Sequence, residues 1–146
     1  MHINNVLKKF LQDTSIETGN SLYLTDLENV VGFANKNSFI EMNDSISKAL
    51  LVKFLYFAND NENKPHYYFT NKKNNVISIM EEKEKNKKWH SQIIFPIFID
   101  DMLYGSLIVV NKFKKFNENK IFHSTEVTAE FVFKILLNAL REHNAK

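Results

Sequence analysis

The 146-residue chain contains no cysteine, one arginine, two prolines and three glycines. The lack of cysteine excludes a disulfide framework, a thiolate nucleophile and cysteine-based zinc or iron–sulfur sites. The glycines, Gly19, Gly32 and Gly105, are too far apart to form a phosphate-binding loop. We therefore set aside thiol chemistry and the common nucleotide-binding fingerprints.

Arginine is scarce, and Arg141 is its only occurrence among 19 basic residues. The chain therefore lacks the set of arginine guanidinium groups that usually form paired hydrogen bonds with guanine or phosphate. Its net charge is only +2. The charged run from 81 to 88 interleaves glutamate with lysine, which favours a solvated loop or helical turn over a nucleic-acid patch. We expect no direct binding of nucleic acid.

Long apolar runs are also missing, and none approaches the length that spans a bilayer. The first residues alternate apolar and polar side chains, unlike the apolar core of a signal peptide. With 44% hydrophobic residues the chain suits one compact unit. We expect a single soluble cytoplasmic domain over residues 1–146, without a membrane partner.

The strongest structural pattern is an apolar hairpin from Gln92 to Lys112. β-branched and aromatic residues fill both arms, and Asp100-Asp101 forms the turn between them. Pro96 indicates a position in the first arm where no N–H is needed, and Gly105 indicates a bulge or the close approach of another backbone.

The rest of the chain predicts three helices and four further strands. The helices are expected at 2–18, ending at Gly19, at 44–57, capped by Asp44 or Ser45, and at 123–144, capped by Ser124 or Thr125. The strands are expected at 21–25, 30–34, 66–70 and 76–80, with a surface loop at 59–65.

The two terminal helices carry more apolar rows than one sheet face can cover, which predicts a homodimer. The expected interface consists of Ile3, Val6, Leu7, Phe10, Leu11, Phe133, Leu136, Leu137 and Leu140.

The order of elements, with Asn111-Lys112 at a strand end, resembles GAF domains, which are small-molecule-sensing and dimerisation modules. Many of these carry a signature that continues through Phe and three residues to Asp-Glu. Phe122 fits, whereas Glu126 replaces the Asp and Val127 replaces the Glu. The resemblance implies an α+β sandwich with an antiparallel sheet of five or six strands, terminal helices on one face, and the middle helix with loops on the other. It also implies that Lys112 and Glu126 pair at the start of the last helix.

Within that superfamily the chain is most similar to the C-terminal domain of the stage V sporulation protein T family of transcriptional regulators. The similar segments are SLYLTDLENVVGFAN, IEMNDSISKAL and IIFPIFIDDMLYGSLIVV. This resemblance implies a role in transcriptional or signalling control. The chain begins at the helix that leads into the GAF-like unit, so DNA binding does not carry over. A profilin-like or roadblock-like module shares the same order of elements.

The resemblance places any ligand between the sheet and the segment from 33 to 50. The residues expected there are Phe33, Asn35, Phe39, Phe54, His66, Tyr68, Trp89 and His90. The alternative is that the aromatic residues of this set simply fill the core at normal density.

No catalytic or metal site is predicted, and no cofactor. The five histidines, at positions 2, 66, 90, 123 and 143, lack metal-ligand spacing. Asp100-Asp101 is interpreted as turn chemistry, with cation binding as the alternative. The leading hypothesis is a non-enzymatic sensory or regulatory domain that dimerises and takes a small-molecule effector. A purely structural dimerisation module with a self-filled pocket is the second, and an enzyme is the third.

Overall fold

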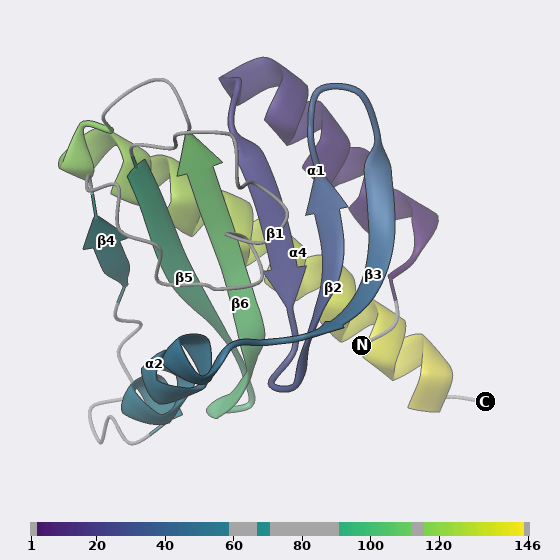
Figure 1. Ribbon diagram of the computed structural model, residues 1–146. Helices are drawn as coiled ribbons and strands as arrows, with labels where there is room; N and C mark the ends of the chain where they lie inside the picture. The colour runs from purple at the N-terminus through teal and green to yellow at the C-terminus, as the bar shows by residue number, and fades with distance from the viewer. Residues whose placement is uncertain (1–2, 59–66, 71–90, 112–115, 145–146) are drawn as a thin grey trace.

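The computed structural model describes residues 3–58, 67–70, 91–111 and 116–144. Six strands and three helices lie in these residues (Figure 1). In chain order they are α1 (Asn5–Thr18), β1 (Ser21–Thr25), β2 (Asn29–Ala34), β3 (Phe39–Ser45), α2 (Lys48–Ala58), β4 (Tyr68–Thr70), β5 (Ser91–Ile99), β6 (Met102–Asn111) and α4 (Glu118–Asn144).

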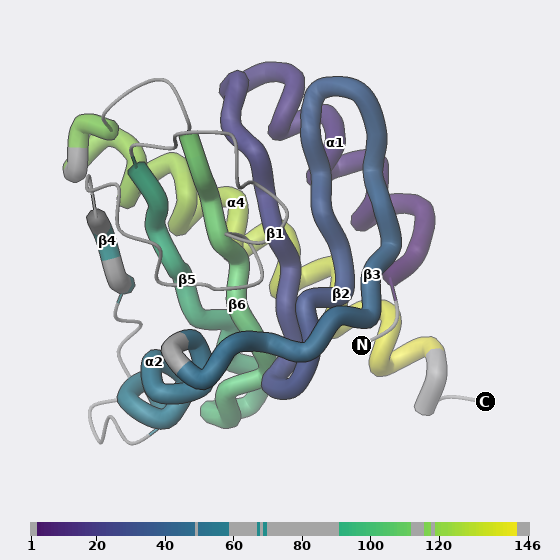
Figure 2. Tube along the Cα trace, in the orientation of Figure 1, coloured from purple at the N-terminus to yellow at the C-terminus, as the bar shows by residue number. Residues whose placement is uncertain are grey.

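The strands form one antiparallel sheet in the order β3-β2-β1-β6-β5-β4. β1 and β6 pair along the centre of this sheet, so the N-terminal strands and the C-terminal hairpin lie side by side (Figure 2). Since sequence-distant strands meet there, the fold depends on contacts that no local pattern reveals.

Helices cover both faces of the sheet, with α1 and α4 on one face and α2 on the other (Figure 1). We call these the helical face and the α2 face. The fully buried side chains of the helical face include Leu7, Leu11, Leu24, Ile93, Leu107 and Val132. Those of the α2 face include Val30, Leu50, Ile94 and Ile108. The predicted α+β sandwich is therefore confirmed.

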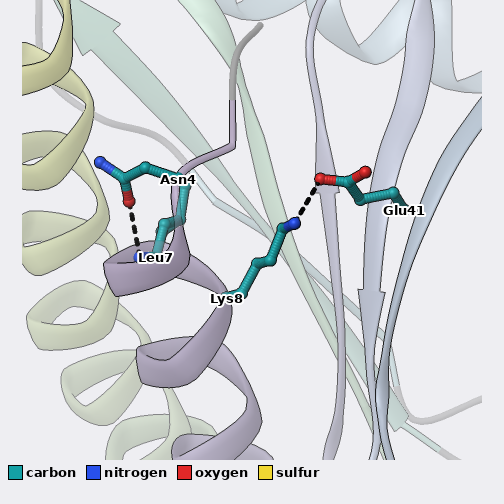
Figure 3. Close-up of polar contacts among 4 residues, drawn as sticks. All are labelled: Asn4, Leu7, Lys8 and Glu41. Atoms are coloured by element: carbon teal, nitrogen blue, oxygen red, sulfur yellow. Dashed lines mark hydrogen bonds and ion pairs between the residues drawn. The ribbon is translucent and has the colours of Figure 1, made fainter.

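Helix α1 has a defined start and end. The Asn4 side chain accepts a hydrogen bond from the Leu7 backbone N–H at 2.8 Å, which caps the first turn (Figure 3). Gly19 ends the helix with φ of 72°, a left-handed conformation that glycine adopts without a Cβ penalty. Lys8 Nζ lies 2.7 Å from Glu41 Oε1 and links α1 to β3 (Figure 3).

The predicted hairpin of β5 and β6 is confirmed in detail. Asp100 and Asp101 have φ of 52° and 63°, as in the type I′ turns that match the twist of a hairpin. The register shifts between Ile97 and Phe98, opposite Gly105. A Cβ on Gly105 would overlap the Thr25 backbone carbonyl of β1, so the glycine permits close approach of a neighbouring strand.

Pro96 fits the position expected for it. It lies two residues beyond Ile94, the last β5 residue that pairs with β4. Its missing N–H therefore removes no hydrogen bond to β4 within the described residues.

Two helix starts were wrong. Asp44 and Ser45 belong to the edge strand β3, and α2 begins only at Lys48, where the Ser47 hydroxyl accepts from the Leu50 N–H at 3.2 Å. β3 escapes sequence reasoning because none of its residues is buried, and its three apolar residues show no clear period of two.

The last helix begins at Glu118, five residues earlier than predicted. Asn117 caps it by accepting from the Lys120 N–H, whereas Thr125 is buried within the helix. Glu126 therefore lies in the third turn and not near the positive end of the helix dipole.

The middle of the chain is described in part. β4 confirms the end of the strand predicted at 66–70. The predicted strand 76–80, the loop 59–65 and the charged run 81–88 lie outside the described residues.

Candidate functional site

The ligand site was predicted on the α2 face of the sheet, and the side chains on this face are mainly aromatic and aliphatic. Tyr23 of β1 and Phe33 of β2 lie with ring centroids 4.6 Å apart. Ile94 and Ile108 pair across β5 and β6 on the same face. Leu50, Phe54 and Phe57, on one row of α2 as the helical spacing predicts, pack onto this surface.

Gln92 is the exception to this apolar surface. Its neighbour Ile93 faces the helical core, whereas Ile94 and the cross-strand partner Val110 belong to the α2 face, so the Gln92 side chain lies on the α2 face. It is 0% exposed. Among the residues that the structure describes, neither Nε2 nor Oε1 has a hydrogen-bond partner.

An unpartnered buried amide is costly. Leaving a buried donor or acceptor unsatisfied costs about 1–3 kcal/mol, and more than nine in ten buried polar groups in proteins have a partner. Sequence reasoning missed Gln92. The available signal was a polar residue in an otherwise apolar strand, next to the run Ile93-Ile94-Phe95.

The eight predicted ligand residues do not all come together. Phe33 and Phe54 lie on the α2 face. Phe39 packs against the helical core on the other side of the sheet, because the alternation of β3 turns it there. The Asn35 side chain accepts from the N–H groups of residues 37 and 38 and thus stabilises the β2–β3 turn.

Four ligand predictions stay open. His66, Trp89 and His90 lie outside the described residues. Tyr68 is the β4 residue that pairs with Ile94.

The predicted dimer residues also divide into groups. Ile3, Leu7, Leu11 and Leu136 are buried in the chain's own core, so they present no surface to a second copy. This corrects their assignment, because the sheet covers more of each helix than the rows suggested. Phe10, Phe133, Leu137 and Leu140 are half-buried against that core.

The exposed apolar surface of the helical layer includes one predicted interface residue, Val6, and two residues that were not predicted, Val127 and Phe131. Val6 is 64% exposed and Phe131 is 49% exposed. Phe131 lies 5.5 Å from Phe10 between ring centroids, and Lys134 Nζ lies 5.7 Å from its ring. Val127 is one turn before Phe131 and also exposed. The predicted interface omitted Val127 and Phe131 because its residues from the last helix came from the other apolar row.

The signature residues serve local structure. Asn111 Nδ2 donates to Asn20 Oδ1 at 2.8 Å and thereby ties the end of β6 to the start of β1. The Phe122 ring stacks on Tyr67 at 4.2 Å and lies 5.8 Å from Phe95. Lys112 lies outside the described residues, so its pairing with Glu126 stays a prediction.

Metal ligands do not gather in the part of the chain that the structure describes, where no group of three His, Asp or Glu side chains is placed to hold an ion. Within the same residues, no helix has the length and apolar character to cross a membrane.

Comparison with known proteins gives one informative likeness. No protein-family model matches the sequence, and no curated protein does. Among solved structures, the chain resembles the blue-light absorbing form of the PixJ GAF domain of Thermosynechococcus elongatus. The TM-score is 0.59, the identity is 13%, and the match covers 94% of this chain and 90% of that one. A likeness at this identity establishes the fold, and the chain therefore has the fold of a GAF domain.

Proposed function

We propose that the chain is a non-enzymatic sensory or regulatory domain that binds a small metabolite on its α2 face and forms a homodimer through its helical layer. The GAF fold supports the general class. The similarity to the C-terminal domain of the stage V sporulation protein T family supports a place in transcriptional or signalling control. The helical layer's exposed Val6, Val127 and Phe131 support self-association.

Gln92 is the observation that carries the ligand proposal. A strand that could hold an isoleucine or methionine instead holds an amide whose two polar atoms are buried and make no hydrogen bond within the described residues. A ligand that forms hydrogen bonds with this amide would recover the cost of about 1–3 kcal/mol of leaving it unsatisfied. The arrangement suits function because free energy lost in the unliganded state is regained on binding.

The amide also suggests the chemistry of the ligand. Its oxygen accepts and its nitrogen donates, side by side in one plane. A neutral amide, lactam or protonated carboxylic acid presents the complementary edge. Tyr23, Phe33 and Ile94 would supply apolar contact around it.

The second candidate is a structural dimerisation module whose α2 face is filled by its own side chains. The close contact of Tyr23 with Phe33 and the complete burial of Leu50 favour it. In that case Gln92 contributes only a cost to stability.

A thermal-shift screen separates the two candidates. Nucleotides, amino acids, amides and short acids are added to the wild-type protein and to Gln92→Met. A ligand of the native state raises the unfolding temperature, and a ligand bonded by Gln92 loses that effect in the variant. A panel that shifts neither protein would favour the structural module.

A further inference from the structure

Helix α2 is apolar on both of its sides. One side packs onto the sheet through Leu50, Phe54 and Phe57. The other exposes Leu51, which is 41% exposed, and Leu55, which is 60% exposed. A helix that is hydrophobic all round is normally covered on all sides.

The outer side of α2 borders a groove of about 470 Å³. Phe54, Phe98 and Leu103 are among the groove residues that also pack in the α2-face core. The remaining apolar lining includes Leu55 of α2, Leu27 of the β1–β2 turn and Met102 at the start of β6. The groove thus lies between α2 and the tips of the β1–β2 and β5–β6 hairpins. Figure 1 shows the two hairpin tips next to each other, close to α2.

The hairpin tips are held by hydrogen bonds of their own. The hydroxyls of Thr25 and Ser106 bond at 2.8 Å in a buried position between β1 and β6. The Ile46 N–H donates to the Glu28 carbonyl at 3.0 Å, which ties the segment before α2 to the β1–β2 turn. The walls of the groove are therefore preformed, which lowers the entropic cost of filling it.

Carboxylates mark one end of this groove. Asp101 is the charged member of its lining, Asp100 adjoins it, and Glu28 adjoins Leu27; all three are exposed. The β5–β6 turn does not require acidic side chains, because Asn-Gly adopts two successive positive φ values more easily than Asp-Asp does. Lys48 lies on the same row of α2 as Leu51 and Leu55, one turn earlier, outside the lining.

We propose that this groove binds an amphipathic helix of a partner protein, with large apolar residues at i, i+3 and i+7 and Lys or Arg beside the hairpin tips. Apolar side chains on one helical face match the groove, and cations match its acidic end. A second copy of this chain fits less well, because the lining of the same patch, among the described residues, contains no Lys or Arg to face Asp101. The groove shares Phe54 with the α2-face core, but Gln92 and the proposed dimer residues lie outside its lining.

Model peptides test the proposal on the full chain. One labelled peptide of about four helical turns carries Leu on one face and Lys elsewhere, and the other carries Glu in place of Lys. Fluorescence anisotropy should show the Lys peptide binding at least about fivefold more tightly than the Glu peptide. High salt should reduce this ratio, because the carboxylates are exposed.

Three variants locate the binding. Asp100→Asn with Asp101→Asn keeps side chains that tolerate positive φ and should bring the two peptides to similar affinities. Leu55→Asp should abolish binding of the Lys peptide. Val52→Asp, an equally exposed apolar-to-acid change on α2 outside the groove lining, should not weaken it.

Three results would overturn the proposal. They are equal binding of the two peptides by the wild type, equal losses in Leu55→Asp and Val52→Asp, and no binding of the Lys peptide at high micromolar protein. Circular dichroism of each variant confirms that it remains folded.

Discussion

Replacing Gln92 by methionine should stabilise the unliganded protein, although most substitutions in a core do the opposite. Methionine is similar in length and unbranched, so it fills the same space without polar atoms. Both polar atoms of Gln92 lack a hydrogen bond within the described part of the chain, in a side chain that is 0% exposed. Removing them relieves a penalty of about 1–3 kcal/mol.

The expected rise in melting temperature follows from this range. In a domain of about 150 residues each kcal/mol moves the midpoint by roughly 2–4 °C, which gives roughly 2–12 °C. Urea unfolding should give the same sign, with an unchanged slope if the unfolded state is unaffected.

A fall in stability would refute the reasoning. It would mean that the amide makes hydrogen bonds in the folded protein, as most buried amides do. Gln92→Glu serves as the opposite control, because an isosteric side chain that ionises should destabilise this apolar position strongly.

Three further predictions concern the fold and the dimer. Thr25→Val should lower the free energy of unfolding in urea by about 1–3 kcal/mol, because it leaves the buried Ser106 hydroxyl without its hydrogen-bond partner. The same change at Thr125, whose buried hydroxyl has no hydrogen-bond partner in the described ranges, should be neutral or stabilising. Gly105→Ala should destabilise by about 3 kcal/mol or more, because the new Cβ overlaps the backbone of β1. Phe131→Lys should convert the proposed dimer, at twice 17.2 kDa in light scattering, to the monomer mass.

Each of these has a contradicting outcome. Equal effects at the two threonines would show that burial and not hydrogen bonding sets the cost. A loss below about 1 kcal/mol for Gly105→Ala would show that the central strands separate easily. A wild-type protein that is monomeric at micromolar concentration would contradict the proposed dimer. Val52→Lys, a change at an exposed residue of α2, is the control for the effect of added charge.

Sequence predicted best where the local chemistry permits one structure. Gly19 follows a clear helical row and adopts the left-handed conformation that ends α1. The Asp100-Asp101 turn lies between two apolar runs whose lengths set the register of β5 and β6. In each case one short segment contains all the information.

Sequence predicted least where distant segments decide the outcome. The second half of β3 is mostly polar and forms a strand because it pairs with β2, so Asp44 resembled a helix cap. Phe39 and Phe33 are both aromatic, yet Phe39 pairs with Ala34, the residue after Phe33, so the pleat places them on opposite faces. The missing partner of Gln92 depends on every neighbour around it, which periodicity does not report.

The side-chain amide of Gln92 gives the most direct measurement of ligand sensing. In ¹⁵N-labelled protein its NH₂ resonances are assigned by their loss in Gln92→Met, and a metabolite that raises the unfolding temperature is then added. We predict that these resonances shift in proportion to the fraction bound, as a new hydrogen bond to Nε2 and Oε1 requires. Saturation with the metabolite while the Gln92 resonances stay unchanged would contradict the account.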